Sequence, residues 1–122
     1  MSKRILVVED HEDNRQILRD LLGAAGFEMI EAHDGESAHP TASREKPDLI
    51  LMDIQLPGLD GYEATRRIKG DPALAAIPVI VVTSYALSGD EEKARLAGCD
   101  DYVAKPYSPR QLLAKIRHYL PD

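Results

Sequence analysis

The sequence predicts an α/β protein whose parallel five-stranded sheet is covered by helices on both faces. The first observation is a set of short, almost continuous apolar runs, which are typical of parallel strands buried on both sides. The second is that stretches with helical spacing and helix-capping residues separate these runs, so strands and helices alternate. The clearest apolar runs are Ile5–Val8, Leu49–Met52, Val79–Val82 and Tyr102–Ala104.

The first strand is predicted over Arg4–Val8 and is followed by a helix that begins at Asp13. Gln16 stands three residues after Asp13, so the two are expected to form a capping box. Gly26 is expected to end the helix, because glycine is common just after the last helical residue. The apolar stripe of this helix consists of Ile17, Leu18, Leu21, Leu22 and Ala25. A second strand is predicted over Phe27–Ala32.

A proline interrupts the sequence pattern of the second predicted helix. A turn at Asp34-Gly35 leads into Glu36–Lys46, which contains Pro40. Proline inside a helix lacks the amide that would bond back one turn. We therefore expect a short, distorted or late-starting helix, ended by Lys46-Pro47.

The second half of the chain continues the alternation of strands and helices. The last helix has a strong start, with Ser108 as cap, Pro109 at the first helical position and Gln111 in place for a capping box. Right-handed crossovers in a short chain favour the flavodoxin-like strand order 2-1-3-4-5, in which strands one and three flank the ligand-binding switch point. The other elements expected are strands Asp48–Met52, Pro78–Thr83 and Tyr102–Ala104, and helices Tyr62–Lys69 and Gly89–Ala97.

Size and composition narrow the classes of protein to consider. The chain has 122 residues, enough for one domain with a core of its own, and we assign residues 1–122 to it. It contains no apolar run near the roughly 20 residues of a membrane span and no signal-peptide core. A net charge of −6 argues against nonspecific nucleic-acid binding. The only cysteine, Cys99, cannot form an internal disulfide, so a cytoplasmic location is the expectation.

Polar residues stand at or just after the ends of four predicted strands. These are the pair Glu9-Asp10, then Asp53, Thr83 and Lys105. In an open α/β sheet, ligands bind outside the carboxyl ends of the strands. Three carboxylates, a hydroxyl and an ammonium would therefore meet at one edge, a set that suits a divalent cation and a phosphoryl group.

The carboxylates are candidates for a Mg²⁺ site, because hard cations prefer oxygen ligands. Asp10, Asp53 and the backbone carbonyl of Gln55 could bind the ion directly, with Glu9 acting through water. The alternative is that Glu9 and Asp10 only cap the helix that follows.

Lys105 and Thr83 each have a functional and a structural interpretation. Lys105 could hold a phosphoryl oxygen or form a plain salt bridge to Asp53, and a cis bond to Pro106 would direct it into the site. Thr83 could donate its hydroxyl to the phosphoryl group or be an ordinary strand residue.

A carboxylate beside a metal and a lysine, without a Ser-His pair, favours formation of an aspartyl-phosphate on Asp53. A flavin site is a competing interpretation, but the acidic segment Glu9–Asp13 would repel a phosphate that lacks a metal. A phosphatase with the same intermediate would need an acid two residues after the nucleophile, where Gln55 stands. We read the four histidines, His11, His33, His39 and His118, as surface residues.

The chain resembles the response-regulator receiver domains of two-component signalling over essentially its whole length, in the order and the spacing of several segments that include the polar residues above. Parts of the sequence are most similar to single-domain cell-division regulators of the DivK type. The segments that carry the resemblance are Ile5–Asp10, Pro47–Gly61, Val82-Thr83 and Tyr102–Pro106, with Gly89–Lys93 and Ala97–Cys99 for the finer match.

The resemblance implies a phosphoacceptor domain rather than an enzyme, with at most self-phosphorylation and slow loss of phosphate. A histidine kinase or histidine phosphotransfer protein would donate to Asp53, with Mg²⁺ held by Asp10, Asp53 and Gln55 and with Glu9 in its outer shell. Thr83 and Lys105 would bind the phosphoryl oxygens. Tyr102 would turn inward as a switch and change the face formed by the fourth helix, fifth strand and fifth helix, where a downstream protein binds.

Two expectations concern the whole protein and the lifetime of its phosphorylated form. Met1 before the first strand and Pro121 at the end favour a complete single-domain protein, a monomer or weak dimer; the alternative is a receiver excised from a larger hybrid kinase or transcriptional regulator. We also expect Tyr85 and Gln55 to hinder the hydrolytic water.

Overall fold

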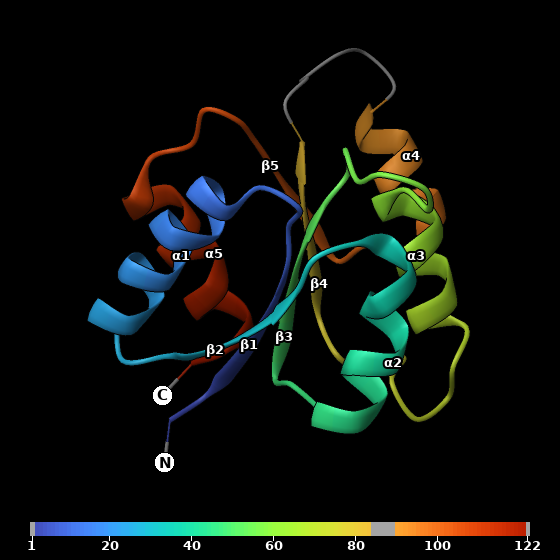
Figure 1. The fold of residues 1–122 in the computed structure, drawn as a ribbon, viewed down its shortest axis with the longest axis horizontal. Helices are drawn as coiled ribbons and strands as arrows, with labels where there is room; N and C mark the ends of the chain where they lie inside the picture. Colours follow the sequence, from blue (N-terminus) through green and yellow to red (C-terminus); the bar gives the residue numbers. More distant parts are fainter. Residues whose placement is uncertain (1, 84–89, 122) are drawn as a thin grey trace.

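The computed structural model describes residues 2–83 and 90–121, which form a five-stranded parallel sheet with the order β2-β1-β3-β4-β5 (Figure 1). The predicted fold class and strand order are confirmed. The strands are β1 (Arg4–Val8), β2 (Glu28–Ala32), β3 (Leu49–Asp53), β4 (Val79–Thr83) and β5 (Asp101–Ala104). The helices are α1 (Glu12–Ala24), α2 (Gly35–Glu45), α3 (Gly61–Lys69), α4 (Asp90–Ala97) and α5 (Pro109–Tyr119).

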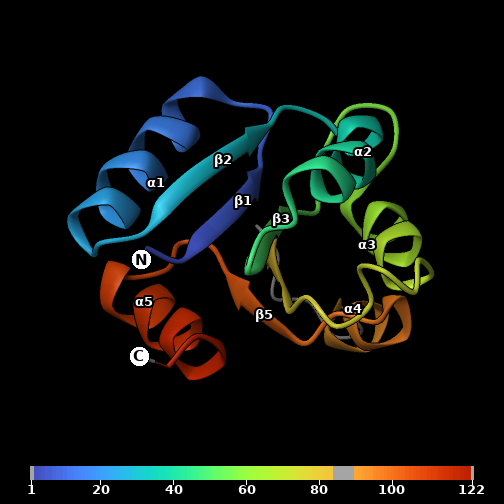
Figure 2. The same cartoon turned by 90° about the horizontal axis from the view of Figure 1, so that it is seen from below.

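Helices cover both faces of the sheet, with α1 and α5 on one side and α2, α3 and α4 on the other (Figure 2). The side chains of each strand alternate between the two cores. On β1, Ile5 and Val7 pack toward the α1–α5 side, whereas Leu6 and Val8 pack toward the α2–α4 side. This two-residue period explains why the central strands are apolar at every position.

The first helix begins differently from the prediction. Its N-cap is His11, which makes no side-chain capping bond, and the helix starts at Glu12. The predicted capping box of Asp13 and Gln16 is therefore wrong, because Asp13 already lies in the first turn and the Gln16 side chain donates to Asp20 instead. Ile17 also departs from the predicted stripe, since 58% of its surface is exposed.

The second helix is longer and more regular than predicted. It runs without a break over Gly35–Glu45 with Pro40 inside it, so the expected distortion and late start are wrong. Asp34 caps the first turn by accepting a hydrogen bond from the Ser37 amide at 2.8 Å. Ala38 and Ala42 are fully buried on either side of the proline. Packing of this face and the cap compensate for the one amide that Pro40 lacks.

The last helix agrees with its sequence pattern. Ser108 and Gln111 form the predicted capping box, and Pro109 occupies the first turn. Leu112, Ile116 and Leu120 are buried in the α1–α5 core. Among residues 2–83 and 90–121, no helix combines the length and apolarity that crossing a membrane requires.

Candidate functional site

Two carboxylates are brought side by side by the pairing of β1 with β3. Val8 pairs with Met52, so Glu9, which follows β1, lies level with Asp53, the last residue of β3. Glu9 is 3% and Asp53 5% exposed. Together with Asp10 they present three carboxylate oxygens that all lie within 4.8 Å of one another. Acids this close and this buried repel one another unless a cation lies among them.

The backbone around the acids fixes their orientation but leaves part of their hydrogen-bonding capacity unused. Glu9 Oε2 accepts from the His11 amide, and Asp53 Oδ1 accepts from the Gln55 amide, both at 3.1 Å. Asp10 Oδ1 is buried, and the described residues offer it no hydrogen-bond partner. A buried carboxylate oxygen without a donor fits direct binding of a metal ion. Glu9 thus caps the amide of His11, the N-cap residue of α1, whereas the buried Asp10 Oδ1 makes no such bond among the described residues.

Lys105 supplies the positive charge of the site from the segment after β5. Its Nζ lies 3.7 Å from Asp53 Oδ2 and 3.5 Å from Glu9 Oε1. The predicted salt bridge to Asp53 is present, and its sharing with Glu9 was not predicted. The bond between Lys105 and Pro106 is cis, as predicted. The ammonium of Lys105 is paired with two of the three clustered carboxylates, so the cluster can accept further positive charge.

Thr83 and Gln55 lie near the acids as their places in the sequence suggest. Thr83 ends β4, is 4% exposed, and its carbonyl oxygen accepts from the Lys105 amide. The loop carrying Gln55 is held close to β3, because a Cβ on Gly61 would lie 2.2 Å from the Asp53 carbonyl oxygen. Any other residue at Gly61 would push the start of α3 away from Asp53.

Two residues near the site were missed by sequence reasoning. Arg15 is buried, and its Nη1 donates to the Glu9 carbonyl oxygen at 2.9 Å. Helical spacing could have predicted this burial, since Arg15 precedes the buried Leu18 and Leu22 by three and seven residues and so shares their face of α1. Tyr107 is the other, and burial raises the pKa of its hydroxyl, with the negative charges of Glu9 and Asp53 adding to the effect.

The structure describes the predicted switch residue, Tyr102, but not Tyr85, which we expect to obstruct the hydrolytic water. Tyr102 is half-buried on β5 and packs against the α2–α4 core. Its turning inward stays a prediction. Ser84 and Tyr85, which follow Thr83, lie outside the described residues.

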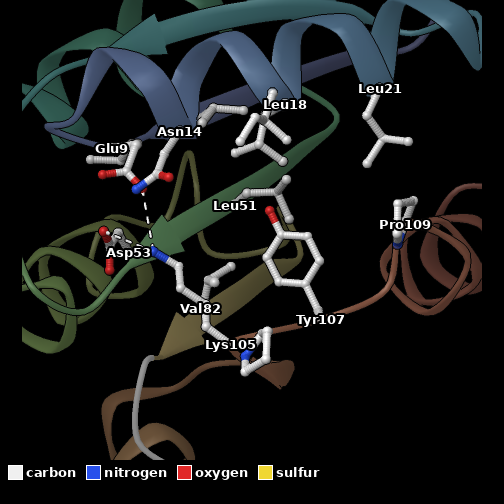
Figure 3. Close-up of a pocket in the computed structure, with 14 residues that line it drawn as sticks. Glu9, Asn14, Leu18, Leu21, Leu51, Asp53, Val82, Lys105, Tyr107 and Pro109 are labelled. Carbon is white, nitrogen blue, oxygen red and sulfur yellow. Dashed lines mark hydrogen bonds and ion pairs between the residues drawn. The ribbon is translucent and has the colours of Figure 1, made fainter.

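A cavity of about 450 Å³ opens beside the acids, between α1 and the segment that follows β5 (Figure 3). Glu9, Asp53 and Lys105 lie at one end of it, and apolar side chains line the rest, including Leu18 and Leu51. Tyr107 stands across it from Leu51. The site is therefore a polar corner joined to an apolar chamber.

A buried carboxylate beside two further acids and a lysine, at the carboxyl edge of a parallel sheet, is typical of the class of phosphoryl-accepting domains. Comparison with known proteins agrees. A sequence model of the response regulator receiver domain matches residues 5–117, and the chain belongs to this family. It is 46% identical to the polar-differentiation response regulator DivK of Brucella anthropi, over 100% of this chain and 99% of that protein. DivK of Brucella ovis matches equally well.

Solved structures place the chain in the same family. It is similar to the receiver domain of the sensor histidine kinase PA1611 from Pseudomonas aeruginosa, with a TM-score of 0.92, 36% identity and full coverage of both chains. That receiver carries a magnesium ion coordinated in its active-site cleft. A putative response regulator from Chloroflexus aurantiacus gives a TM-score of 0.94 at 29% identity, again over both whole chains. The chain is thus a phosphorelay receiver, a signalling module rather than a classical enzyme.

Proposed function

We propose that this chain accepts a phosphoryl group on Asp53 in a Mg²⁺-dependent reaction and passes the signal to a partner protein. One observation carries the proposal: Asp53 is a buried carboxylate that lies within 4.8 Å of the oxygens of Glu9 and Asp10 and 3.7 Å from the Lys105 ammonium. The Mg²⁺ that the Pseudomonas receiver carries supports a metal at the matching acids.

In the proposed reaction, an Asp53 oxygen forms a bond to phosphorus, and the bond from phosphorus to the nitrogen of the donor histidine breaks. The electron pair of that bond stays on the imidazole. Mg²⁺, bound by Asp10, Asp53 and the Gln55 carbonyl with Glu9 in its outer shell, would neutralise charge on the transferring group. Lys105 and Thr83 would hold the phosphoryl oxygens. Gln55 offers no acid for hydrolysis, which favours a lasting aspartyl-phosphate.

The signal would leave through the surface formed by α4, β5 and α5, which we call the output face. Phosphorylation adds about two negative charges and strong acceptors beside Thr83, and a shift of Thr83 would draw Tyr102 inward. Two features support a partner surface here. Leu96 on α4 is 71% exposed, and a hollow lies between α4 and β5 beside Tyr102. A downstream protein is the proposed partner of this face, with the chain a monomer or weak dimer in the cytoplasm.

The proposed phosphoryl transfer could take place in either of two kinds of protein, a single-domain regulator or a larger multidomain one. The match to 99% of the DivK relative supports a single-domain regulator fed by a histidine kinase or histidine phosphotransfer protein. The similarity to a receiver that is part of a sensor histidine kinase supports the alternative, a receiver piece of a larger hybrid kinase or transcriptional regulator.

Incubation with acetyl phosphate and Mg²⁺, followed by intact-mass measurement, tests the acceptor. We expect addition of one phosphoryl group to the wild type, its loss when the metal is chelated, and none in Asp53→Asn. Asp13→Asn is the matched control, because it removes a nearby exposed carboxylate in the first turn of α1. Phosphate addition that persists in Asp53→Asn would contradict the assignment.

A further inference from the structure

The apolar cavity beside the acids has walls from three parts of the chain. α1 provides one wall, the central strands provide the floor, and the segment after β5 provides the opposite wall (Figure 3). Its volume of about 450 Å³ lies within the range of small-molecule sites. Its apolar lining includes Ile17, Leu18, Leu21, Leu51, Val82 and Pro109.

The polar groups of the cavity gather at its end near Asp53. Glu9, Asn14, Asp53 and Lys105 line that end, whereas Leu21 and Pro109 lie far from it (Figure 3). An occupant that satisfies both ends must carry a group suited to the phosphoryl site at one end and an apolar group at the other. A free phosphate or a purely apolar molecule would match only half of the cavity.

We propose that, among acyl phosphates, this chain prefers donors whose apolar acyl chain is a few carbons longer than acetyl, and that this chain of the donor lies in the cavity during transfer. The inference rests on the proposed acceptor role of Asp53 and adds the class of small-molecule donor. Each methylene that leaves water for an apolar site contributes up to about fourfold in binding. Butyryl phosphate, with two methylenes more than acetyl phosphate, therefore reacts faster than acetyl phosphate at equal subsaturating concentration.

The transfer is balanced without a further reactant. An Asp53 oxygen forms the new bond to phosphorus, and the bond between phosphorus and the acyl oxygen breaks. The electron pair of the broken bond leaves with the carboxylate, so no proton has to be supplied. Acetate and butyrate are nearly equal in basicity, so a rate difference between the two donors reports on contact of the chain with the protein.

Ile17 provides a sharp test because it combines exposure with a place on the cavity wall. It is 58% exposed, so its truncation leaves the buried core intact. Leu96 on α4 is a matched control, since it is 71% exposed and does not line the cavity. Contact of the acyl chain with Ile17 makes the donor preference sensitive to Ile17→Ala and insensitive to Leu96→Ala.

The experiment measures initial rates of phosphate addition to Asp53 by intact mass, with acetyl and butyryl phosphate under the same Mg²⁺ concentration. We expect a butyryl-to-acetyl rate ratio on the order of ten for the wild type. Ile17→Ala lowers the ratio by about two- to threefold, because butyryl phosphate loses more apolar contact than acetyl phosphate does, and Leu96→Ala leaves the ratio as it is.

The outcomes separate this inference from the proposed function. Labelling by acetyl phosphate with a ratio of one or less overturns the donor preference and leaves the acceptor role of Asp53 standing. A high ratio that Ile17→Ala and Leu96→Ala change equally also overturns it. If neither donor labels Asp53, the donor preference is wrong, and so is the proposal that Asp53 accepts a phosphoryl group from small molecules.

Discussion

Two groups of acidic residues lie next to each other in this molecule and are neutralised in opposite ways. In the first, which we call the paired cluster, Glu12 and Glu31 are bound by arginines of α1: Arg15 Nη2 lies 2.7 Å from Glu12, and Arg19 Nη2 lies 2.8 Å from Glu31. In the second, which we call the acid site, Lys105 Nζ lies 3.5 Å from Glu9 Oε1 and 3.7 Å from Asp53 Oδ2, and Asp10 Oδ2 lies 3.8 Å from the exposed ring of His11.

The difference shows how a functional carboxylate can be told from a structural one. Acids that a protein uses for its own stability are matched by its own cations, as in the paired cluster. The acid site has an excess of buried negative charge, and Asp10 Oδ1 has no donor among the described residues. Burying such charge is unfavourable, and this cost supports the proposed binding of a cation from solution at the acid site.

The largest expected effect comes from removing one acid of the unmatched group. Asp10→Asn should weaken Mg²⁺ binding by at least about tenfold, because a direct anionic ligand is lost. Without metal, the same variant should unfold at a higher temperature than the wild type, because one repulsive charge is gone. Calorimetric titration with Mg²⁺ and thermal unfolding in chelator measure the two effects.

Glu31→Gln is the control, since it removes a carboxylate of the paired cluster that has its own arginines. It should leave Mg²⁺ affinity unchanged and lower the unfolding temperature. If Asp10→Asn and Glu31→Gln changed Mg²⁺ binding equally, the distinction between the two groups would be wrong.

The next effect concerns the two arginines of the paired cluster, which differ in burial and in what they reach. Arg15 has a 9% exposed side chain and also donates to the Glu9 carbonyl oxygen, whereas the Arg19 side chain is 36% exposed. Arg15→Met should lower the free energy of unfolding by about 2–3 kcal/mol, because the buried Glu9 carbonyl oxygen loses its donor and the packed side chain loses its ion pairs. Arg19→Met should cost at most about 1 kcal/mol.

Urea unfolding of both variants measures this difference. Arg15→Met should also weaken Mg²⁺ binding if the bond to Glu9 holds the metal-binding segment in place. A simple charge effect has the opposite sign, because loss of a nearby cation would strengthen Mg²⁺ binding. Tighter binding in Arg15→Met would therefore show that its charge matters more than its bond to Glu9.

The strand order and the acid site could be predicted because each depends on short-range patterns. The buried strands are apolar at every position, and their carboxyl ends must meet at one edge of a parallel sheet. The same rule predicts that Glu9, Asp10 and Asp53 lie together. The pairing of Lys105 with Asp53 followed from the same rule.

The remaining features depend on packing between distant segments, which no local pattern reveals. Pro40 indicated a broken α2, but Ala38 and Ala42 are buried on the sheet and Asp34 caps the first turn, so the helix continues through it. The predicted cap at Asp13 was wrong because the N-cap of α1 is His11, two residues earlier, and the helix begins at Glu12. Tyr107 belongs to the cavity only because its segment lies opposite α1.

The smallest effect is a dependence of stability on pH that belongs to the paired cluster. A hydrogen bond from Arg15 lowers the pKa of Glu12, and the positive charges of Arg15 and Arg19 add to this against the opposing effect of desolvation. The native carboxylate thus binds a proton more weakly than the unfolded one. Its contribution to stability is complete above the ordinary pKa of 4.5 and disappears as the pH falls through the lower native value.

Glu12→Gln should therefore lower the unfolding temperature slightly at neutral pH and reduce its decline in acid, below the ordinary pKa of 4.5. Asp13→Asn is the matched control, because Asp13 also lies in the first turn of α1 and feels the same helix dipole. Asp13 forms no ion pair among the described residues. Of these two acids, only Glu12 has arginine partners. If the fall of the unfolding temperature in acid becomes shallower in Glu12→Gln but not in Asp13→Asn, the pairing of Glu12 with the arginines is its cause. If the unfolding temperature depended on pH in the same way in Glu12→Gln and Asp13→Asn, the pH dependence would come from the helix dipole. The contrast between Glu12, which has arginine partners, and Asp13, which has none among the described residues, would then be wrong.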